Sequence, residues 1–321
     1  MNLLLLILGL VLTVVGADWL VNGSVAVAKR YRMPEFLIGI TIVGIGTSMP
    51  ELVVSLFASL SGRGSIAIGN VLGSNLANTL LILGAAAVIR PISFSRDAIK
   101  TDIPYNILVS AVLLLMCFGF RFWVPQHGGI ISRVEGAVLL AMFAIYMFYS
   151  FRSAANSNNQ NNTDIPDVQQ DALIWKSLIA IAAGITGLAL GGRWFVNGAS
   201  GLAAALGVSE TIIAITIVAI GTSLPELATA VVASVKGRSQ LALGNIIGSN
   251  IFNICLILGV SSVARPLNGS GIMLIDIAAP LAAVILLWIS AFTLRGRRIN
   301  RTDGVIFLAV YIAYVVYLAL R

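Results

Sequence analysis

The segment TIVGIGTSMPE at residues 41–51 places a carboxylate and three hydroxyls inside an apolar run. A membrane-spanning helix carries such polar groups only rarely, and usually for a function. The segment recurs as TIVAIGTSLPE at residues 216–226, with nine of eleven positions identical. The chain is 58% hydrophobic and 10% charged, whereas a soluble domain has about 25% charged residues. We therefore expect an all-α integral membrane protein whose duplicated polar segment serves its function.

Ten apolar stretches are long enough to cross a bilayer core of about 30 Å. The second and seventh are 27 residues long, and each holds a Gly-Thr-Ser-x-Pro-Glu sequence near its middle, which predicts a tilt or a break. The expected spans are 2–22, 34–60, 66–88, 104–124, 136–151, 173–196, 209–235, 241–263, 271–294 and 304–320.

The repeat extends well beyond these two segments. At a constant shift of 175 residues, matches run from the first span to the end of the third, and the last spans match at a shift of 168. Five spans per half is an odd number, so the second half is expected to enter the membrane upside-down. The sequence thus predicts two inverted five-helix repeats, residues 1–151 and 173–321, joined by a flexible cytoplasmic linker at 152–172. Inverted repeats are typical of secondary transporters.

The basic residues predict the orientation. If the N-terminus lies outside the cytoplasm, 14 of the 20 Lys and Arg residues fall on the cytoplasmic side of the membrane. The excess of positive charge in cytoplasmic loops then puts both termini outside, in the plasma membrane or bacterial inner membrane. Because these residues are scattered in short loops, the net charge of +7 does not indicate nucleic-acid binding. Nothing in the sequence indicates an enzyme, a cofactor or an obligate protein partner.

Two acidic residues differ from the other eleven, which lie in loops or near span ends. Glu51 and Glu226 are near the middle of spans, where a charge costs on the order of 3 kcal/mol. No Lys or Arg lies within ten residues of either in its own span. The expected counter-charge is a bound cation.

The neighbours of Glu51 and Glu226 indicate which ion. Thr47 and Ser48 precede Glu51 by four and three residues, a spacing that puts oxygens on one helix face. Pro50 is expected to free a main-chain carbonyl upstream, at Gly44. A spacing of four also puts a polar stripe on one face of the third and eighth spans, formed by Asn70, Ser74 and Asn78 and by Asn245, Ser249 and Asn253. Asn75 and Asn250 lie off this stripe and are expected to connect helices. An all-oxygen set suits Ca²⁺ or Na⁺ rather than zinc or copper. The full set is Gly44, Thr47, Ser48, Glu51, Ser74 and Asn78 with Ala219, Thr222, Ser223, Glu226, Ser249 and Asn253.

The motifs Gly-Thr-Ser-x-Pro-Glu and Gly-Asn-x-x-Gly-Ser-Asn, each present twice, resemble those of the Ca²⁺/cation antiporter superfamily, and specifically its prokaryotic sodium/calcium exchangers. The resemblance covers nearly the whole chain. It implies ten helices, of which eight form a rigid bundle while spans one and six slide across it. It also implies that the twelve residues above line the ion sites.

The expected function is exchange of Na⁺ for Ca²⁺ by alternating access at one midplane site. Two carboxylates balance one Ca²⁺, and shared oxygens make binding of Ca²⁺ and Na⁺ mutually exclusive. Repulsion between the carboxylates lets protons compete, so a Ca²⁺/H⁺ antiporter is the alternative. Two further classes stay open: a cation channel, which would carry ions without a counter-ion, and a structural membrane scaffold. The inverted repeat is evidence against a channel.

Overall fold

The computed structural model describes residues 1–118, 130–160, 174–205, 219–293 and 297–320. Within these ranges, eight helices are long and apolar enough to cross a membrane, and a ninth span forms if the bent pair Glu35–Thr47 and Met49–Leu60 is one crossing. The helical membrane class is therefore confirmed. The seventh expected span, 209–235, is described only from residue 219 onward, so the count of ten stays a prediction.

The first half begins with one long helix and continues through shorter helical pieces, some of them π-helical (η). In chain order these elements are α1 (Asn2–Arg30), α2 (Glu35–Ile38), η1 (Gly39–Val43), α3 (Gly44–Thr47), α4 (Met49–Leu60), α5 (Gly64–Leu76), η2 (Ala77–Ile82), α6 (Leu83–Ile89), β1 (Ile92–Ser93), η3 (Ala98–Asp102), α7 (Ile103–Phe118), β2 (Ile130–Ile131) and α8 (Arg133–Gln160).

The second half repeats this order as far as it is described. Its elements are α9 (Ile174–Ala205), α11 (Ala219–Thr222), α12 (Leu224–Val235), α13 (Ser239–Ile251), η6 (Phe252–Leu258), α14 (Gly259–Ala264), β3 (Leu267–Asn268), α15 (Leu274–Thr293), β4 (Arg298–Ile299) and α16 (Arg301–Leu320). Helices α4 and α5 correspond to α12 and α13 at the shift of 175, residue for residue at both ends, and α3 and α11 end at equivalent residues. The duplication seen in the sequence is therefore also a duplication of structure.

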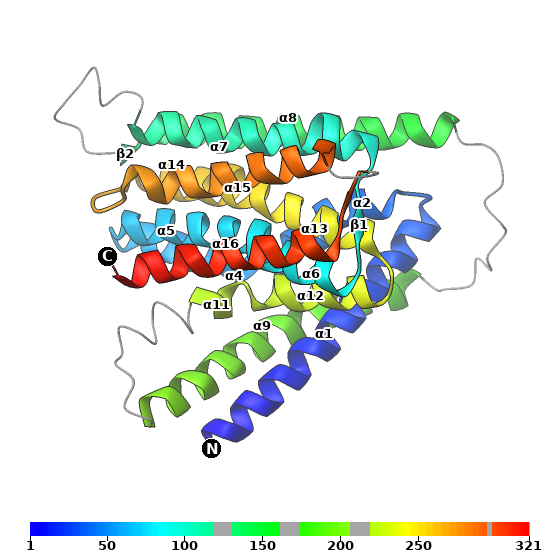
Figure 1. Ribbon diagram of the computed structural model, residues 1–321, viewed down its shortest axis with the longest axis horizontal. Helices are drawn as coiled ribbons and strands as arrows, with labels where there is room; N and C mark the ends of the chain where they lie inside the picture. Colours follow the sequence, from blue (N-terminus) through cyan, green and yellow to red (C-terminus); the bar gives the residue numbers. More distant parts are fainter. Residues whose placement is uncertain (119–129, 161–173, 206–218, 294–296, 321) are drawn as a thin grey trace.

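The two halves interlock at both ends of the molecule. Strand β1 pairs antiparallel with β4, and β2 pairs antiparallel with β3, so each short sheet takes one strand from each half. The two sheets lie at opposite ends of the helix bundle (Figure 1). The two halves also approach closely within the helices, where Gly84 packs against Gly304 and Gly259 packs against Gly136.

Helices α8 and α16 start with equivalent caps. The Ser132 amide donates to Glu135, and the Ser132 hydroxyl accepts from the Glu135 amide, which forms a capping box. At the start of α16, the Asn300 amide donates to Asp303. Glu135 and Asp303 therefore open spans, as their sequence positions predict.

Helices α1 and α9 lie side by side and cross the other helices obliquely (Figure 1). They run antiparallel, since Gly9 contacts Gly191, Gly16 contacts Gly184 and Gly23 contacts Ser177. A Cβ atom at Gly16 would stand 2.8–3.0 Å from backbone atoms of α9. Glycine is thus what permits the two backbones to touch, as in other close helix pairs in membranes.

One predicted boundary differs from the structure. The sequence predicts a linker from residue 152, but α8 continues as helix to Gln160. The polar run after residue 152 lacks the apolar periodicity that marks a helix in a sequence, yet a helix that has already begun can extend with one backbone bond per residue. The rest of the expected linker, residues 161–172, lies outside the described residues.

Candidate cation site

The two duplicated motifs interrupt their helices in the same way. In the first half, α3 ends at Thr47 and α4 restarts at Met49, with a bend of 49° between the flanking segments. Pro50 and Pro225 stand in the first turns of α4 and α12, where proline is tolerated because its missing N–H would have no helical partner. Glu51 and Glu226 also lie in those first turns, at the positive ends of the helix dipoles.

Both carboxyl groups are buried: Glu51 is 0% and Glu226 is 1% exposed. The described ion pairs join Lys236 to Asp18 and Arg238 to Glu35, and neither involves a buried Glu. The Glu226 carboxylate lies close enough to Glu51 for the two like charges to interact. Two buried acidic groups with no basic side chain beside them in the described residues need compensation from another source.

Hydroxyl groups cross between the halves at this centre. Ser48 Oγ donates to Glu226 Oε1 at 2.9 Å and lies 3.0 Å from Ser249 Oγ. From the second half, Ser223 Oγ lies 3.4 Å from Ser74 Oγ of the first half. Both of these hydroxyls face the Glu51 carboxylate. The structure therefore brings the motif serines Ser48 and Ser223 to the Glu of the other half rather than to the Glu of their own motif, because the helix break interrupts the helical register.

The Gly44 carbonyl is not freed in the way that the sequence predicts. It accepts the backbone amide of Ser48 at 3.1 Å and lies 3.4 Å from Thr47 Oγ1 and 3.5 Å from Ser249 Oγ. The reason is register, because a proline at 50 removes the amide that would bond four residues back, at Gly46. Gly44 still lies among the site residues, and its two hydroxyl contacts are long. Ala219 is the first described residue of α11, and its role as a ligand stays a prediction.

Five acceptor oxygens at this centre have no hydrogen-bond donor of good geometry among the described residues. They are Glu51 Oε1 and Oε2, Glu226 Oε2, Asn78 Oδ1 and Asn253 Oδ1. All five atoms are buried, and buried acceptors normally have partners. Carboxylate and amide oxygens are the ligands that Ca²⁺ and Na⁺ take. The donor set thus fits a hard cation, and the described residues contain no cluster of three His, Cys, Asp or Glu that would indicate another metal site.

Asn70 and Asn245, which lie on the polar stripe of the third and eighth spans but outside the twelve predicted ligands, also make hydrogen bonds here. Thr47 Oγ1 donates to Asn245 Oδ1 at 3.1 Å, and Asn70 Nδ2 donates to Ser55 Oγ at 3.0 Å. Both asparagines follow the glycine that opens the Gly-Asn-x-x-Gly-Ser-Asn motif, so their presence in both copies was an available signal. The sequence-predicted Thr222 is half-buried and follows Gly221 at the end of α11.

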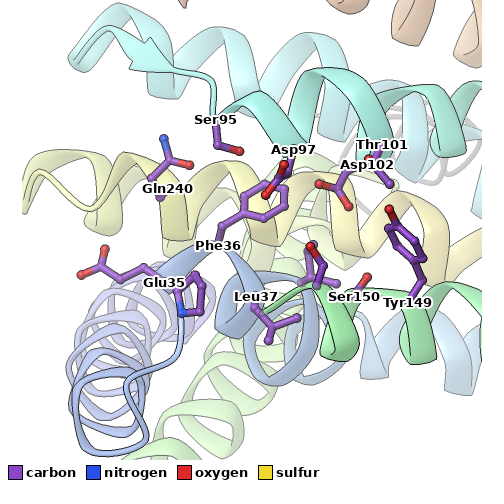
Figure 2. Close-up of a pocket in the computed structure, with 13 residues that line it drawn as sticks. Glu35, Phe36, Leu37, Ser95, Asp97, Thr101, Asp102, Tyr149, Ser150 and Gln240 are labelled. Carbon is purple, nitrogen blue, oxygen red and sulfur yellow. The ribbon is translucent and has the colours of Figure 1, made fainter. Parts of the chain in front are cut away.

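A separate cavity of about 400 Å³ lies between α2, η3, α8 and α13 (Figure 2). None of the twelve predicted ligands lines it. Its most buried acidic residue is Asp102, which is 6% exposed and accepts a hydrogen bond of 2.9 Å from the Tyr146 hydroxyl. In the sequence, Asp102 is one of the eleven acidic residues that lie in loops or near span ends. The structure instead buries it, because α8 supplies a phenol as donor.

The helices and their buried acidic centre define a polytopic membrane protein with polar groups concentrated between two halves. The model of the sodium/calcium exchanger protein family matches residues 1–152 and 176–320. The chain belongs to this family, which is one of exchangers and not of enzymes.

Individual relatives agree with this assignment. The sodium/calcium exchanger MaX1 of Methanosarcina acetivorans is 34% identical over 346 residues, covering 99% of this chain and 98% of the relative. The inner membrane protein YrbG of Escherichia coli is 38% identical over 267 residues, covering 82% of this chain and 79% of the relative. Among solved structures, one of the sodium-calcium exchanger NCX_Mj superposes with a TM-score of 0.83 at 32% identity, and 98% of each chain is covered.

Proposed function

We propose that this chain exchanges Na⁺ for Ca²⁺ at the site formed by Glu51, Glu226 and the ten residues predicted with them. The observation that carries the proposal is a pair of buried carboxylates, one from each half, with three of their four oxygens lacking a donor in the described structure. Two negative charges match one Ca²⁺. The names of the relatives, which include a sodium/calcium exchanger, support this choice of ions.

Coupling follows from shared ligands. A Ca²⁺ ion takes six to eight oxygens, and a set that includes both carboxylates, hydroxyls and amide oxygens leaves no second set for Na⁺ at the same place. Ca²⁺ and Na⁺ therefore exclude one another. Two carboxylates close enough to repel also accept a proton more readily than an isolated one, so H⁺ competes for the same oxygens.

Alternating access is supported by the arrangement of the halves. The equivalent helices α1 and α9 run antiparallel, as two inverted repeats require. Lys236, after α12, pairs with Asp18 and donates to Asn22 at 2.7 Å, which ties α1 to the second half at one end. The residues that correspond to Asp18 and Lys236 at the shift of 175 are Arg193 and Ser61, which have no opposite charges to pair. This asymmetry favours a protein that is closed at the end where Lys236 pairs with Asp18.

For the orientation, we propose that both termini lie outside the cytoplasm, in the plasma membrane of a prokaryote. The excess of Lys and Arg on the side of the β1–β4 sheet supports this assignment. The rigid bundle of eight helices, with α1 and α9 sliding across it, is part of the same proposal.

The test is Ca²⁺ uptake by the purified full chain in liposomes. An outward Na⁺ gradient is expected to drive uptake, and an imposed pH gradient without Na⁺ is expected to drive little. Uptake under the pH gradient alone would instead identify a Ca²⁺/H⁺ antiporter. Ca²⁺ flux that needs no counter-ion would identify a channel.

A further inference from the structure

Four asparagine amides form a buried cluster where α5 and η2 meet α13 and η6. Asn75, Asn78, Asn250 and Asn253 are each at most 2% exposed, and Thr79 beside them is 0% exposed. An amide group can point in two ways, with its oxygen and nitrogen exchanged, and its hydrogen-bond partners decide which. Only the orientation that turns Oδ1 of Asn78 and Asn253 away from the cluster makes these two residues useful to a cation.

The first chain of hydrogen bonds determines the orientation of the Asn253 amide group. Asn75 Nδ2 lies 3.1 Å from the backbone carbonyl of Asn250, and a carbonyl only accepts, so the amino group of Asn75 must face it. The Oδ1 of Asn75 then faces Asn253 and accepts from its Nδ2 at 3.0 Å. Asn253 Oδ1 is left without a donor in the described structure. Turning Asn253 round would place two oxygens against each other.

The second chain of hydrogen bonds determines the orientation of the Asn78 amide group, and it includes the hydroxyl of Thr79. Thr79 Oγ1 donates its one proton to the backbone carbonyl of Asn75 at 2.9 Å. Toward Asn250 the Thr79 oxygen can therefore only accept, and Asn250 Nδ2 donates to it at 2.9 Å. Asn250 Oδ1 in turn accepts from Asn78 Nδ2 at 3.1 Å. Asn78 Oδ1 is left without a donor in the described residues.

We propose that Asn75, Asn250 and Thr79 are positioning residues that hold the amide oxygens of Asn78 and Asn253 toward the transported cation. This inference rests on the proposed function. Each chain ends on a backbone carbonyl, which cannot reverse its polarity, so the orientation of both ligand amides is determined by the backbone. The residues four positions before the two ligand asparagines lie at the acidic centre, because Ser74 faces the Glu51 carboxylate and Ser249 Oγ is 3.0 Å from Ser48 Oγ.

The two chains differ in one link. Asn75 reaches a carbonyl directly, whereas Asn250 reaches one only through the hydroxyl of Thr79. The residue that corresponds to Thr79 in the second half is Ile254, which has no hydroxyl. The orientation of the Asn78 amide therefore depends on the Thr79 hydroxyl, which a single conservative substitution removes without changing any proposed ligand. In Thr79→Val the amide of Asn250 loses its anchor, and Asn78 can turn its amino group toward the ion.

The experiment compares Thr79→Val with Thr79→Ser in the full chain. Equilibrium Ca²⁺ binding is measured by calorimetry on purified protein, the Ca²⁺ KM and maximal rate by Na⁺-driven uptake into liposomes, and the melting temperature in Na⁺- and Ca²⁺-free buffer. We expect Thr79→Val to raise the Kd and KM for Ca²⁺ by about 10–100-fold, as for other groups that orient metal ligands. Thr79→Ser, which keeps the hydroxyl, is expected to restore the wild-type values. Thr79→Ala removes the hydroxyl with a different shape and is expected to match Thr79→Val.

The matched control is Ile254→Val, at the equivalent position of the other half, which is expected to leave the KM unchanged. A lower melting temperature in Thr79→Val and Thr79→Ala with wild-type Kd and KM would show a structural role and overturn the inference. Failure of the proposed function looks different, because the wild-type chain itself would then show no Na⁺-driven Ca²⁺ uptake.

Discussion

Ser48 of the first half donates a hydrogen bond to Glu226 of the second half, with 2.9 Å between Oγ and Oε1. Both residues are at most 1% exposed. The bond is charge-assisted when Glu226 is ionised, and it joins two residues at the two helix breaks that lie 178 residues apart in the chain. It therefore joins the two halves at the point where we propose that ions bind.

Replacement of Ser48 by Ala is expected to destabilise the ion-free protein. A hydrogen bond to a charged group contributes about 1.5–3 kcal/mol, and its loss leaves a buried carboxylate oxygen without a donor. The measurement is the melting temperature of the purified variant in Na⁺- and Ca²⁺-free buffer. Ser290→Ala is the control, since the Ser290 hydroxyl bonds within its own helix, to the Leu286 carbonyl. Equal melting temperatures for Ser48→Ala and wild type would contradict the prediction.

Glu51→Gln and Glu226→Gln are each expected to abolish exchange. Glutamine has nearly the same shape but removes one of the two charges that balance Ca²⁺, so the site retains a single negative charge. Uptake of Ca²⁺ by liposomes under a Na⁺ gradient should fall to the level of protein-free liposomes, while the chain remains folded by circular dichroism. Glu35→Gln, which removes a partly exposed carboxylate paired with Arg238, is the control and should transport normally. Retained exchange in either site variant would place the cation elsewhere.

The sequence predicts most of the fold because it contains two copies of the same information. The shift of 175 residues reappears as identical bounds in α4 and α12, and the positions of Pro50 and Pro225 predict where the helices restart. The apolar surroundings of Glu51 and Glu226 predict their burial. These features depend on neighbours in the chain, so a local pattern is enough to find them.

Contacts between the halves could not be predicted in the same way. Spacing places Ser48 near Glu51, but its hydroxyl bonds to Glu226, because the break turns α4 away from α3. Likewise Asp102 lies near a span end in the sequence, and its burial depends on Tyr146, 44 residues later. Asn75 and Asn250 connect helices, as the sequence predicts, but the particular hydrogen-bonded chains that they form depend on how two helices cross. Their signal was the second asparagine of each Gly-Asn-x-x-Gly-Ser-Asn motif, whose bonding partners lie in the other half.

Tyr146→Phe is expected to lower stability and to leave exchange unchanged. The variant removes the donor to the buried Asp102 carboxylate, for a loss of about 1.5–3 kcal/mol if the group stays ionised. The cavity beside Asp102 includes none of the proposed ligands, so the KM for Ca²⁺ should not move. Thermal unfolding and uptake kinetics are measured together. Tyr149→Phe, at a tyrosine that is 53% exposed on the same helix, is the control and should melt like wild type. A raised KM in Tyr146→Phe would instead connect this cavity with transport.

Gly191 and Gly192 are adjacent on α9 but meet different surroundings, which provides a paired test of the α1–α9 contact. A Cβ at Gly191 would lie 2.6 Å from the Thr13 amide nitrogen and 2.8 Å from the Gly9 carbonyl oxygen, both backbone atoms of α1. At Gly192 the nearest atom among the described residues would be 3.8 Å away, an ordinary contact.

Gly191→Ala is therefore expected to force α1 and α9 apart, at a cost of about 1–3 kcal/mol from overpacking. If the two helices move as one body during exchange, the same variant also lowers the maximal rate of Ca²⁺ uptake, because a separated pair no longer presents one rigid surface to the bundle. Gly192→Ala should match wild type in melting temperature and rate. Loss of rate in Gly192→Ala with a normal Gly191→Ala would show that α9 acts through its contact with the bundle instead of its contact with α1.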